Sequence, residues 1–306
     1  RLDIMIISAR HGVIASTRSI ATTARTLQDV AADGSVVLSL YKMVSAYAGS
    51  AIRVRRDSDN TEQDIGFNGN GLDTSAIATF GAGANVFIKT WYDQSGSGYN
   101  YTQSSASAQA QIATGAAYAT TVIVGSDSNP VASFDGGDYY DKASSTSYVA
   151  KNGSLVVHCE IDNDTKSSFP YSEKISAGSI FGFAFNNPSS SVHCIQHWNG
   201  GAWIYPYATR AVSNGTMASY IGVVDSGGNS SGAAGSSIYG YENNSNTISS
   251  VGNVDTTLAG NSQVAARFGG LVNSTASSIQ ANVRTFMSFT SVISAADRVS
   301  LNTLTV

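Results

Sequence analysis

The sequence predicts an all-β domain, a sandwich or a barrel, preceded by a short N-terminal arm or helix. From about residue 35 onward, short apolar or aromatic runs recur between clusters of Gly, Asn, Ser and Asp. Several of these runs alternate with a period of two, as in residues 154–161, SLVVHCEI. Many short alternating runs separated by turn residues are typical of a sandwich or barrel, whereas a parallel sheet needs strands interleaved with helices.

The composition favours the same class and indicates the setting in which the protein works. Hydrophobic residues make up 42% of the 306 residues, enough for a sizeable core. Charged residues make up only 12%, roughly half of the usual ~25%. Such a neutral surface, rich in hydroxyls and amides, is typical of secreted or particle-borne β proteins. No apolar run approaches the ~20 residues of a membrane span, so membrane insertion is not expected.

The first 35 residues differ from the rest and are predicted to form an arm or anchor, with the main domain at residues 36–306. In SIATTARTLQDVAADG, Ala24, Leu27 and Ala31 recur at helical spacing and Gly34 follows as a helix stop. The chain begins at Arg1 rather than Met, which predicts that it was processed or cut from a longer protein.

The runs AIRVRR and DIGF, joined by Asp, Ser and Asn residues, predict a β-hairpin. It carries Arg53, Arg55 and Arg56, and acidic residues follow at once: Asp57, Asp59, Glu62 and Asp64. We expect a local ion-pair face and no nucleic-acid partner, because a nucleic-acid binder needs several uncompensated cations. The DSDN stretch also resembles a calcium loop in composition, without that loop's glycine and terminal glutamate.

The stretch WYDQSGSG, beginning at Trp91, predicts the corner of a sheet. Trp91 and Tyr92 alternate on a strand, so one of them enters the core. Asp93 and Ser95 can bond turn amides, and the glycines that follow allow positive φ. The alternative is contact with a sugar, in which Asp93 and Gln94 bond hydroxyls.

The stretch HWNGGAWIYPY holds the densest set of candidate glycan-binding residues, and it predicts a hairpin with Asn-Gly-Gly at its tip. The candidates are Trp198, Asn199, Trp203, Tyr205 and Tyr207. Aromatic rings stack on the C–H faces of sugars, while amides bond the hydroxyls. The alternative is that this face belongs to the core. In the hypothesis of glycan binding, four further tyrosines line a rim or a subunit interface: Tyr139, Tyr140, Tyr239 and Tyr241.

The cysteines and histidines predict no metal site and no cofactor. Cys159 and Cys194 lie in alternating apolar stretches, which favours two buried thiols over a single bridge between neighbouring strands. His193 and His197 share one face of a predicted strand, and a metal there would need a third ligand, for example His158 or Glu160 on a neighbouring strand. Ordinary strand histidines are the favoured interpretation.

A family resemblance rests on residues 39–103, with the helix-like SLYKMVSAYAG, the AIRVRR…DIGF hairpin, and WYDQSGSG followed by TQ. ASFDGGDYY and the closing RTFMSFTSVISAADRVSLNTL add a further strand, a last strand and a short helix with Ser294 as its N-cap. These motifs resemble the arabinofuranosidase B-type catalytic domain and its relatives in phage and bacterial surface proteins. The resemblance implies a concanavalin A-like jelly-roll β-sandwich.

The enzymes of that family use a glutamate nucleophile, an aspartate acid/base after a Gly-Gly pair, and two adjacent cysteines. The segment that best matches the first, residues 200–210, has no acidic residue. Residues 269–274, GGLVNS, have apolar residues where the resemblance places the acid, and no Cys-Cys pair exists. Because both steps of retaining hydrolysis need the paired carboxylates, we expect no enzymatic activity.

These observations favour a non-enzymatic virion surface module with a lectin-like sandwich. In this hypothesis the chain is a phage tail-fibre or receptor-binding part or a capsid decoration protein, and it binds a cell-surface glycan. Residues 1–35 would bind other virion proteins, and a homo-oligomer at the virion surface or outside the cell is expected. The alternative is a secreted arabinofuranosidase-like glycoside hydrolase or a carbohydrate-binding module.

Overall fold

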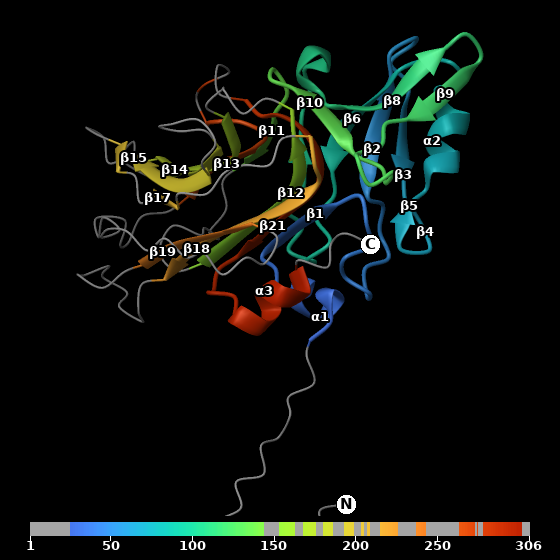
Figure 1. Ribbon diagram of the computed structural model, residues 1–306. Helices are drawn as coiled ribbons and strands as arrows, with labels where there is room; N and C mark the ends of the chain where they lie inside the picture. The colour runs from blue at the N-terminus through green and yellow to red at the C-terminus, as the bar shows by residue number, and fades with distance from the viewer. Residues whose placement is uncertain are drawn as a thin grey trace, which may run out of the picture.

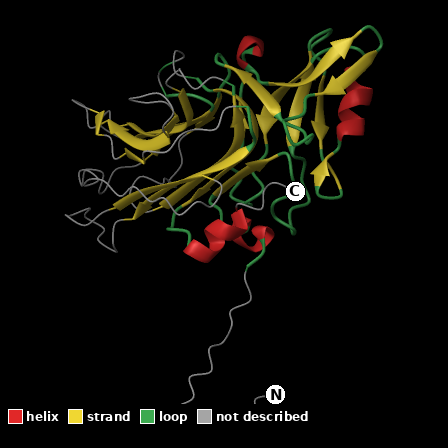
Figure 2. Ribbon diagram, viewed as in Figure 1, coloured by secondary structure: helices red, strands yellow, loops and turns green. Residues whose placement is uncertain are grey.

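The protein is almost entirely β in the part of the chain that the structure, a computed structural model, describes (Figure 1). The described residues are 25–143, 153–162, 168–175, 180–185, 193–198, 203–204, 207–208, 215–225, 237–242, 263–272, 274 and 278–301. Every paired strand among them is antiparallel, and the strands stack as layers with few helices (Figure 2). The predicted all-β sandwich is confirmed.

The first layer is built around the long strand β21. One edge of β21 pairs with β12, which continues to β18 and β19, while its other edge pairs with β1 and then β10. The strands of this layer are β21 (Gln280–Phe289), β12 (Gly153–Ile161), β18 (Ala218–Asp225), β19 (Ser237–Glu242), β1 (Val36–Ser39) and β10 (Ala132–Asp135).

The second layer runs in the order β15–β14–β13–β20–β11–β7–β6–β2–β3. Its strands are β15 (His193–Trp198), β14 (Ile180–Phe185), β13 (Ser168–Ile175), β20 (Gln263–Phe268), β11 (Tyr140–Ala143), β7 (Tyr101–Thr102), β6 (Val86–Trp91), β2 (Ile52–Arg56) and β3 (Glu62–Ile65). The predicted AIRVRR…DIGF hairpin is the β2–β3 pair, with Ile52 opposite Ile65.

Short strands complete and connect the layers. The strand β8 pairs with β6 in the second layer and with β10 in the first, so the two sheets are continuous at this end. The remaining strands are β4 (Phe67–Asn68), β5 (Gly71–Leu72), β8 (Gln111–Ala116), β9 (Ala119–Val122), β16 (Trp203–Ile204) and β17 (Tyr207–Ala208).

An aromatic cluster fills the space between the layers. Tyr171 of β13 stacks on Phe286 of β21 with ring centroids 4.6 Å apart, which joins the second layer to the first. Trp91 and Phe268 meet edge to face at 5.5 Å, and both are fully buried. Such pairs contribute about 0.5–1.5 kcal/mol each beyond the burial of their area.

Two helices cover the outer face of the first layer, and a third packs beside the second layer. The helix α1 (Leu27–Ala31) begins at Thr26, whose hydroxyl and the Asp29 carboxylate cap each other's backbone amides. It buries Val30 in a second apolar cluster that also holds Leu301 of α3 (Ala295–Leu301). Figure 1 shows α1 and α3 side by side below the sheet. The Ser294 cap is confirmed, because its hydroxyl accepts from the Asp297 amide at 3.1 Å.

The helix α2 (Thr74–Gly81), by contrast, was not predicted. It begins at Asp73, which caps the Ala76 amide at 3.0 Å, and ends at Ala82 with a φ of 46°. No helix among the described residues is long and apolar enough to cross a membrane.

The helix-like interpretation of SLYKMVSAYAG is wrong, since the chain leaves β1 at Ser39 and follows an irregular path to residue 50. Gln94 explains the difference. Its amide donates to the carbonyls of Ser39 and Tyr41 at 3.0 and 2.8 Å, and its Oε1 accepts from the Met43 amide at 2.8 Å. Backbone groups that a helix would pair internally are therefore bonded to a side chain from the neighbouring corner.

Candidate functional site

The corner predicted at residues 91–98 is confirmed. Trp91 is fully buried, while the Tyr92 hydroxyl lies on the other face and donates to Asp64 at 2.7 Å. The Asp93 carboxylate accepts from the amides of Val37, Ser95 and Tyr99 at 2.9, 2.9 and 3.1 Å. The atoms of Asp93 and Gln94 that were predicted to bond sugar hydroxyls thus bond the backbone, and both residues are buried.

Replacing Gln94 with alanine is expected to lower the free energy of unfolding by about 2 kcal/mol, because buried backbone groups lose their partners. Urea unfolding followed by tryptophan fluorescence measures this loss. The matched control is Gln28→Ala on the partly exposed face of α1, for which a change within about 0.5 kcal/mol is expected. An equal effect of the two substitutions would contradict the role given to Gln94.

A buried group of polar side chains lies on the inner face of the second layer. Lys142 of β11 is opposite Ala266 of β20, and Ala266 is opposite Glu173 of β13, so the three residues share one face. Only the methyl group of Ala266 separates the two charged side chains along this row. Tyr171 lies two residues before Glu173 on the same face. We call Tyr99, Tyr101, Lys142, Tyr171 and Glu173 the inner polar cluster.

The groups of the inner polar cluster are held firmly. The Tyr171 hydroxyl donates to Glu173 Oε1 at 2.6 Å, and Glu173 is 1% exposed. The Lys142 Nζ lies 3.5 Å from the centroid of the Tyr99 ring, a cation–π contact. The Tyr101 hydroxyl is buried and has no hydrogen-bond partner among the described residues.

The electrostatics of the cluster follow from its burial. Burial lowers the pKa of Lys142 to about 8, while the charges of Glu173 and Asp93 oppose this shift. Burial also raises the pKa values of Tyr101 and Tyr171, so both phenols stay protonated. The cluster therefore gathers an ammonium donor, a carboxylate acceptor and neutral hydroxyls on one buried sheet face, and these are kinds of group that bond polyols.

The loop at residues 269–274 contributes apolar side chains. Gly269 turns the chain with a φ of 86° and its amide donates to the Pro170 carbonyl at 2.8 Å. Leu271 packs against Phe169, and Val272 is 4% exposed. Arg267 holds the loop by donating to the carbonyls of Leu271 and Ser274, and it pairs with Asp141.

Part of the predicted glycan-binding set lies on β15 and on the short strands β16 and β17 that pair with it, at the end of the second layer. Trp198 at the end of β15 is opposite Trp203 in β16, as expected for a hairpin, and Tyr207 of β17 is opposite Cys194. Asn199 and Tyr205 lie outside the described residues. Glycan binding by Trp198, Asn199, Trp203, Tyr205 and Tyr207 stays a prediction.

The other tyrosines do not form one rim. Tyr140 is fully buried, accepts from the Ala110 amide and donates to the Ile88 carbonyl, so placing it at a rim or interface is wrong. Tyr139 lies against the Arg267 guanidinium, 3.8 Å from the centroid of its ring. Tyr239 and Tyr241 lie on β19, in the first layer.

His158 cannot serve as the proposed third metal ligand beside β15. It lies on β12, which pairs with β18 and β21, and its ring bonds Ser219 at 3.0 Å and contacts Arg284 at 3.3 Å. Burial and the Arg284 charge lower its pKa to about 3. Cys159 is a buried free thiol, as predicted, while the Cys194 side chain lies outside the described part.

Comparison with known proteins identifies the scaffold. A family model described as alpha-L-arabinofuranosidase B, catalytic, matches residues 25–159. The chain resembles the arabinofuranosidase B catalytic domain. One similar solved structure is an arabinofuranosidase complexed with arabinofuranosyl-α-1,2-xylobiose, with 16% identity and a TM-score of 0.62. Another is a mutant GH54 α-L-arabinofuranosidase soaked with 4-nitrophenyl α-L-arabinofuranoside, with 15% identity and a TM-score of 0.62.

Each of these two matches covers 91% of this chain and 64% of the other, so the chain spans about two thirds of the length of those enzymes. Comparison with curated proteins gives no match. The predicted resemblance and the β-sandwich fold are confirmed.

The prediction of a virion surface module is wrong. The matching family model and the two solved structures described above are arabinofuranosidases, which supports the alternative hypothesis of an arabinofuranosidase-like domain. The same finding overturns the predicted tail-fibre, capsid-decoration and receptor-binding roles. It also overturns the predicted attachment of residues 1–35 to virion proteins. The homo-oligomer stays a prediction.

Proposed function

We propose that this domain binds α-L-arabinofuranosyl groups of extracellular polysaccharides, and that it binds them without hydrolysing them. The inner polar cluster carries the proposal. It places a buried ammonium, a buried carboxylate and phenols on one sheet face of an arabinofuranosidase-like scaffold. Related structures were solved with 4-nitrophenyl α-L-arabinofuranoside and with arabinofuranosyl-α-1,2-xylobiose, ligands of the same class.

The chemistry of the cluster suits a neutral furanose. Lys142 and the Tyr101 hydroxyl can donate, while the second oxygen of Glu173 and the Tyr171 oxygen can accept, so vicinal sugar hydroxyls can bond both kinds of group at once. The strands β11, β20 and β13 hold these side chains on rigid backbone, which lowers the entropic cost of binding. The strands β15, β16 and β17, which carry Trp198, Trp203 and Tyr207, join β13 through β14 in the same layer.

The same geometry argues against hydrolysis. A retaining glycosidase needs two carboxylates about 5–5.5 Å apart, and an inverting enzyme needs a pair about 6.5–9.5 Å apart. The inner polar cluster supplies one carboxylate, Glu173, and the nearby Asp93 carboxylate is taken up by three backbone amides. The loop that the family resemblance places at the acid position supplies Leu271 and Val272, both apolar.

Binding is tested by isothermal titration against arabinoxylan and against the same xylan with its arabinose removed. We expect binding to the first only, and Lys142→Met and Glu173→Gln should each weaken it at least about tenfold. The matched control is Lys174→Met, because alternation places Lys174 on the opposite face of β13. Thermal melting verifies that each variant is folded. Failure of the wild type to bind any arabinofuranosyl glycan would overturn the proposal.

Hydrolysis is the second candidate, favoured by one observation: Glu173 is a buried carboxylate already bonded by a phenol. Incubation with 4-nitrophenyl α-L-arabinofuranoside tests it through release of nitrophenol. We expect no release above that of the buffer. Release that Glu173→Gln abolishes would establish an enzyme and replace the binding proposal.

A further inference from the structure

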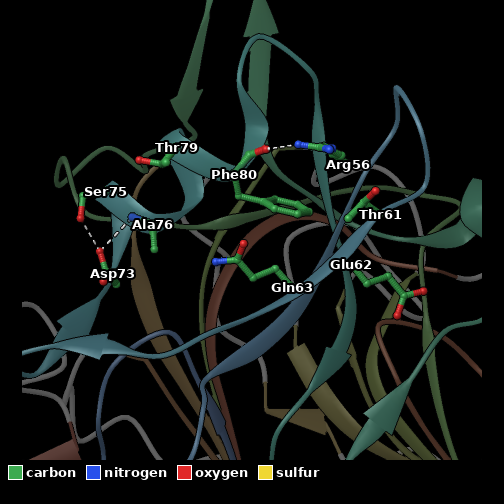
Figure 3. Close-up of a pocket in the computed structure, with 9 residues that line it drawn as sticks. All are labelled: Arg56, Thr61, Glu62, Gln63, Asp73, Ser75, Ala76, Thr79 and Phe80. Carbon is green, nitrogen blue, oxygen red and sulfur yellow. Dashed lines mark hydrogen bonds between the residues drawn. The ribbon is translucent and has the colours of Figure 1, made fainter.

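A groove lies between the strand β3 and the helix α2, at the end of the second layer opposite to β15. Its volume is about 590 Å³, within the roughly 300–1,000 Å³ of small-ligand sites. Figure 3 shows side chains from both elements around it. The lining residues used below are Arg56, Glu62, Gln63, Asp73, Thr79 and Phe80.

The walls of the groove are fixed by local structure. The strand β3 pairs with β2, and among the described strands with no other, so its second edge faces the helix. The helix α2 is anchored by the Asp73 cap and by Ile77 and Phe80, which pack into the core. The Asp73 amide also donates to the Gly66 carbonyl just after β3, at 3.1 Å. The groove is therefore preformed.

The charges of the groove exclude an anionic ligand. Arg56 pairs with Asp59 at 2.7 Å and donates to the Phe80 carbonyl at 3.0 Å. Lys89, next to the groove, pairs with Glu62. Both cations are thus paired with carboxylates, and Asp73 adds one carboxylate that has no cationic partner in the groove, so phosphate or nucleic acid would meet a small net negative charge.

The groove also lacks the apolar surface that a protein partner would bury. Phe80 is 7% exposed and Arg56 covers its ring, with the guanidinium carbon 5.3 Å from the centroid. The exposed acidic side chains of Glu62 and Asp64 oppose addition of a peptide strand to the free edge of β3. The remaining polar groups are hydroxyls, carboxylates and the side-chain amide of Gln63. This side-chain amide makes no hydrogen bond within the described part of the chain.

We infer that this groove is a second binding site for a neutral polysaccharide chain, with Gln63 and Thr79 bonding sugar hydroxyls from opposite walls. The inference rests on the proposed function for its class of ligand. The strands β2, β6 and β7 separate β3 from β11, which carries Lys142, so the two sites lie roughly 20 Å apart across the sheet. A polymer long enough to reach both sites would bind by two linked events, which raises the affinity for long chains above that for short ones.

The test compares arabinoxylan with a short arabinofuranosyl xylobiose by titration. The double variant Gln63→Ala/Thr79→Val should weaken polymer binding about tenfold and leave oligosaccharide binding unchanged. Both residues are exposed, so the fold should be retained, and Thr114→Val on the exposed face of β8 is the matched control.

The outcomes separate this inference from the proposed function. Wild-type protein that binds both ligands, with the double variant identical to it on the polymer, overturns the second site alone. Equal loss on polymer and oligosaccharide would also overturn it, since the groove would then not be a separate site. Wild-type protein that binds neither ligand overturns both proposals.

Discussion

Replacing Asp127 with alanine is expected to lower the free energy of unfolding by about 3–5 kcal/mol, because it leaves a buried cation without its partner. Arg284 of β21 has a fully buried side chain, and its guanidinium bonds both Asp127 oxygens, at 2.5 and 2.6 Å. Arg284 also donates to the carbonyls of Asn129 and Pro130, at 3.2 and 3.1 Å. The pair therefore fastens the turn before β10 to the centre of the first layer.

Urea unfolding followed by tryptophan fluorescence measures this effect. The control is Asp33→Ala, which removes the nearer of two carboxylate partners of Arg25, in a pair whose side chains are 40% and 62% exposed. Exposed pairs contribute about 0–1 kcal/mol, so the control should stay near the wild type. Similar losses in the two variants would show that the Arg284 charge is solvated in solution, contrary to its burial here.

Features that depend on neighbouring residues were predicted correctly from the sequence. The β2–β3 hairpin and the corner after Trp91 are examples, because turn residues and alternation act within a few positions. The loop after β1 was predicted wrongly because its backbone partner, Gln94, lies about 50 residues away in the chain. Tertiary contacts of this kind override local propensity.

The inner polar cluster was missed for the same reason. Lys142 and Glu173 become neighbours only through Ala266, which lies more than 90 residues beyond Glu173 in the chain. A local signal existed. Lys142 lies two positions after Tyr140, Glu173 lies two positions after Tyr171, and both tyrosines enter the core. Alternation alone would have placed both charges on a buried face, and buried charges mark candidate sites.

The error about function has a different origin. The hairpin that suggested phage surface proteins lies within residues 25–159, which match the arabinofuranosidase model. Its strands, β2 and β3, lie further along the second layer, and β6 and β7 separate them from β11, which carries Lys142. Features of a scaffold shared by several families cannot tell apart the functions of those families.

A carboxyl group in the turn between the layers predicts an unusual dependence of stability on pH. Asp138, in the Asp-Gly-Gly-Asp turn between β10 and β11, is 4% exposed, and its Oδ2 accepts from the Asp135 amide at 2.9 Å. Burial raises the pKa of Asp138 to about 7, and the nearby Asp135 carboxylate adds to the increase. The folded protein therefore keeps a proton that the unfolded chain loses near pH 4.

By linkage, the free energy of unfolding of the wild type should fall as pH rises from about 4 to about 7, by up to about 4 kcal/mol from this group, and then level off. Asp138→Asn keeps the acceptor for the Asp135 amide but carries no charge at any pH, so it should be the more stable protein at pH 8 and should lack this decline. Subtracting urea-unfolding profiles of the variant from those of the wild type between pH 4 and 8 isolates the group. Asp135→Asn, which removes the neighbouring charge but leaves Asp138 buried, should keep most of the decline. Parallel profiles for the wild type and Asp138→Asn would mean that Asp138 titrates normally, because the turn opens to water at a small cost in free energy.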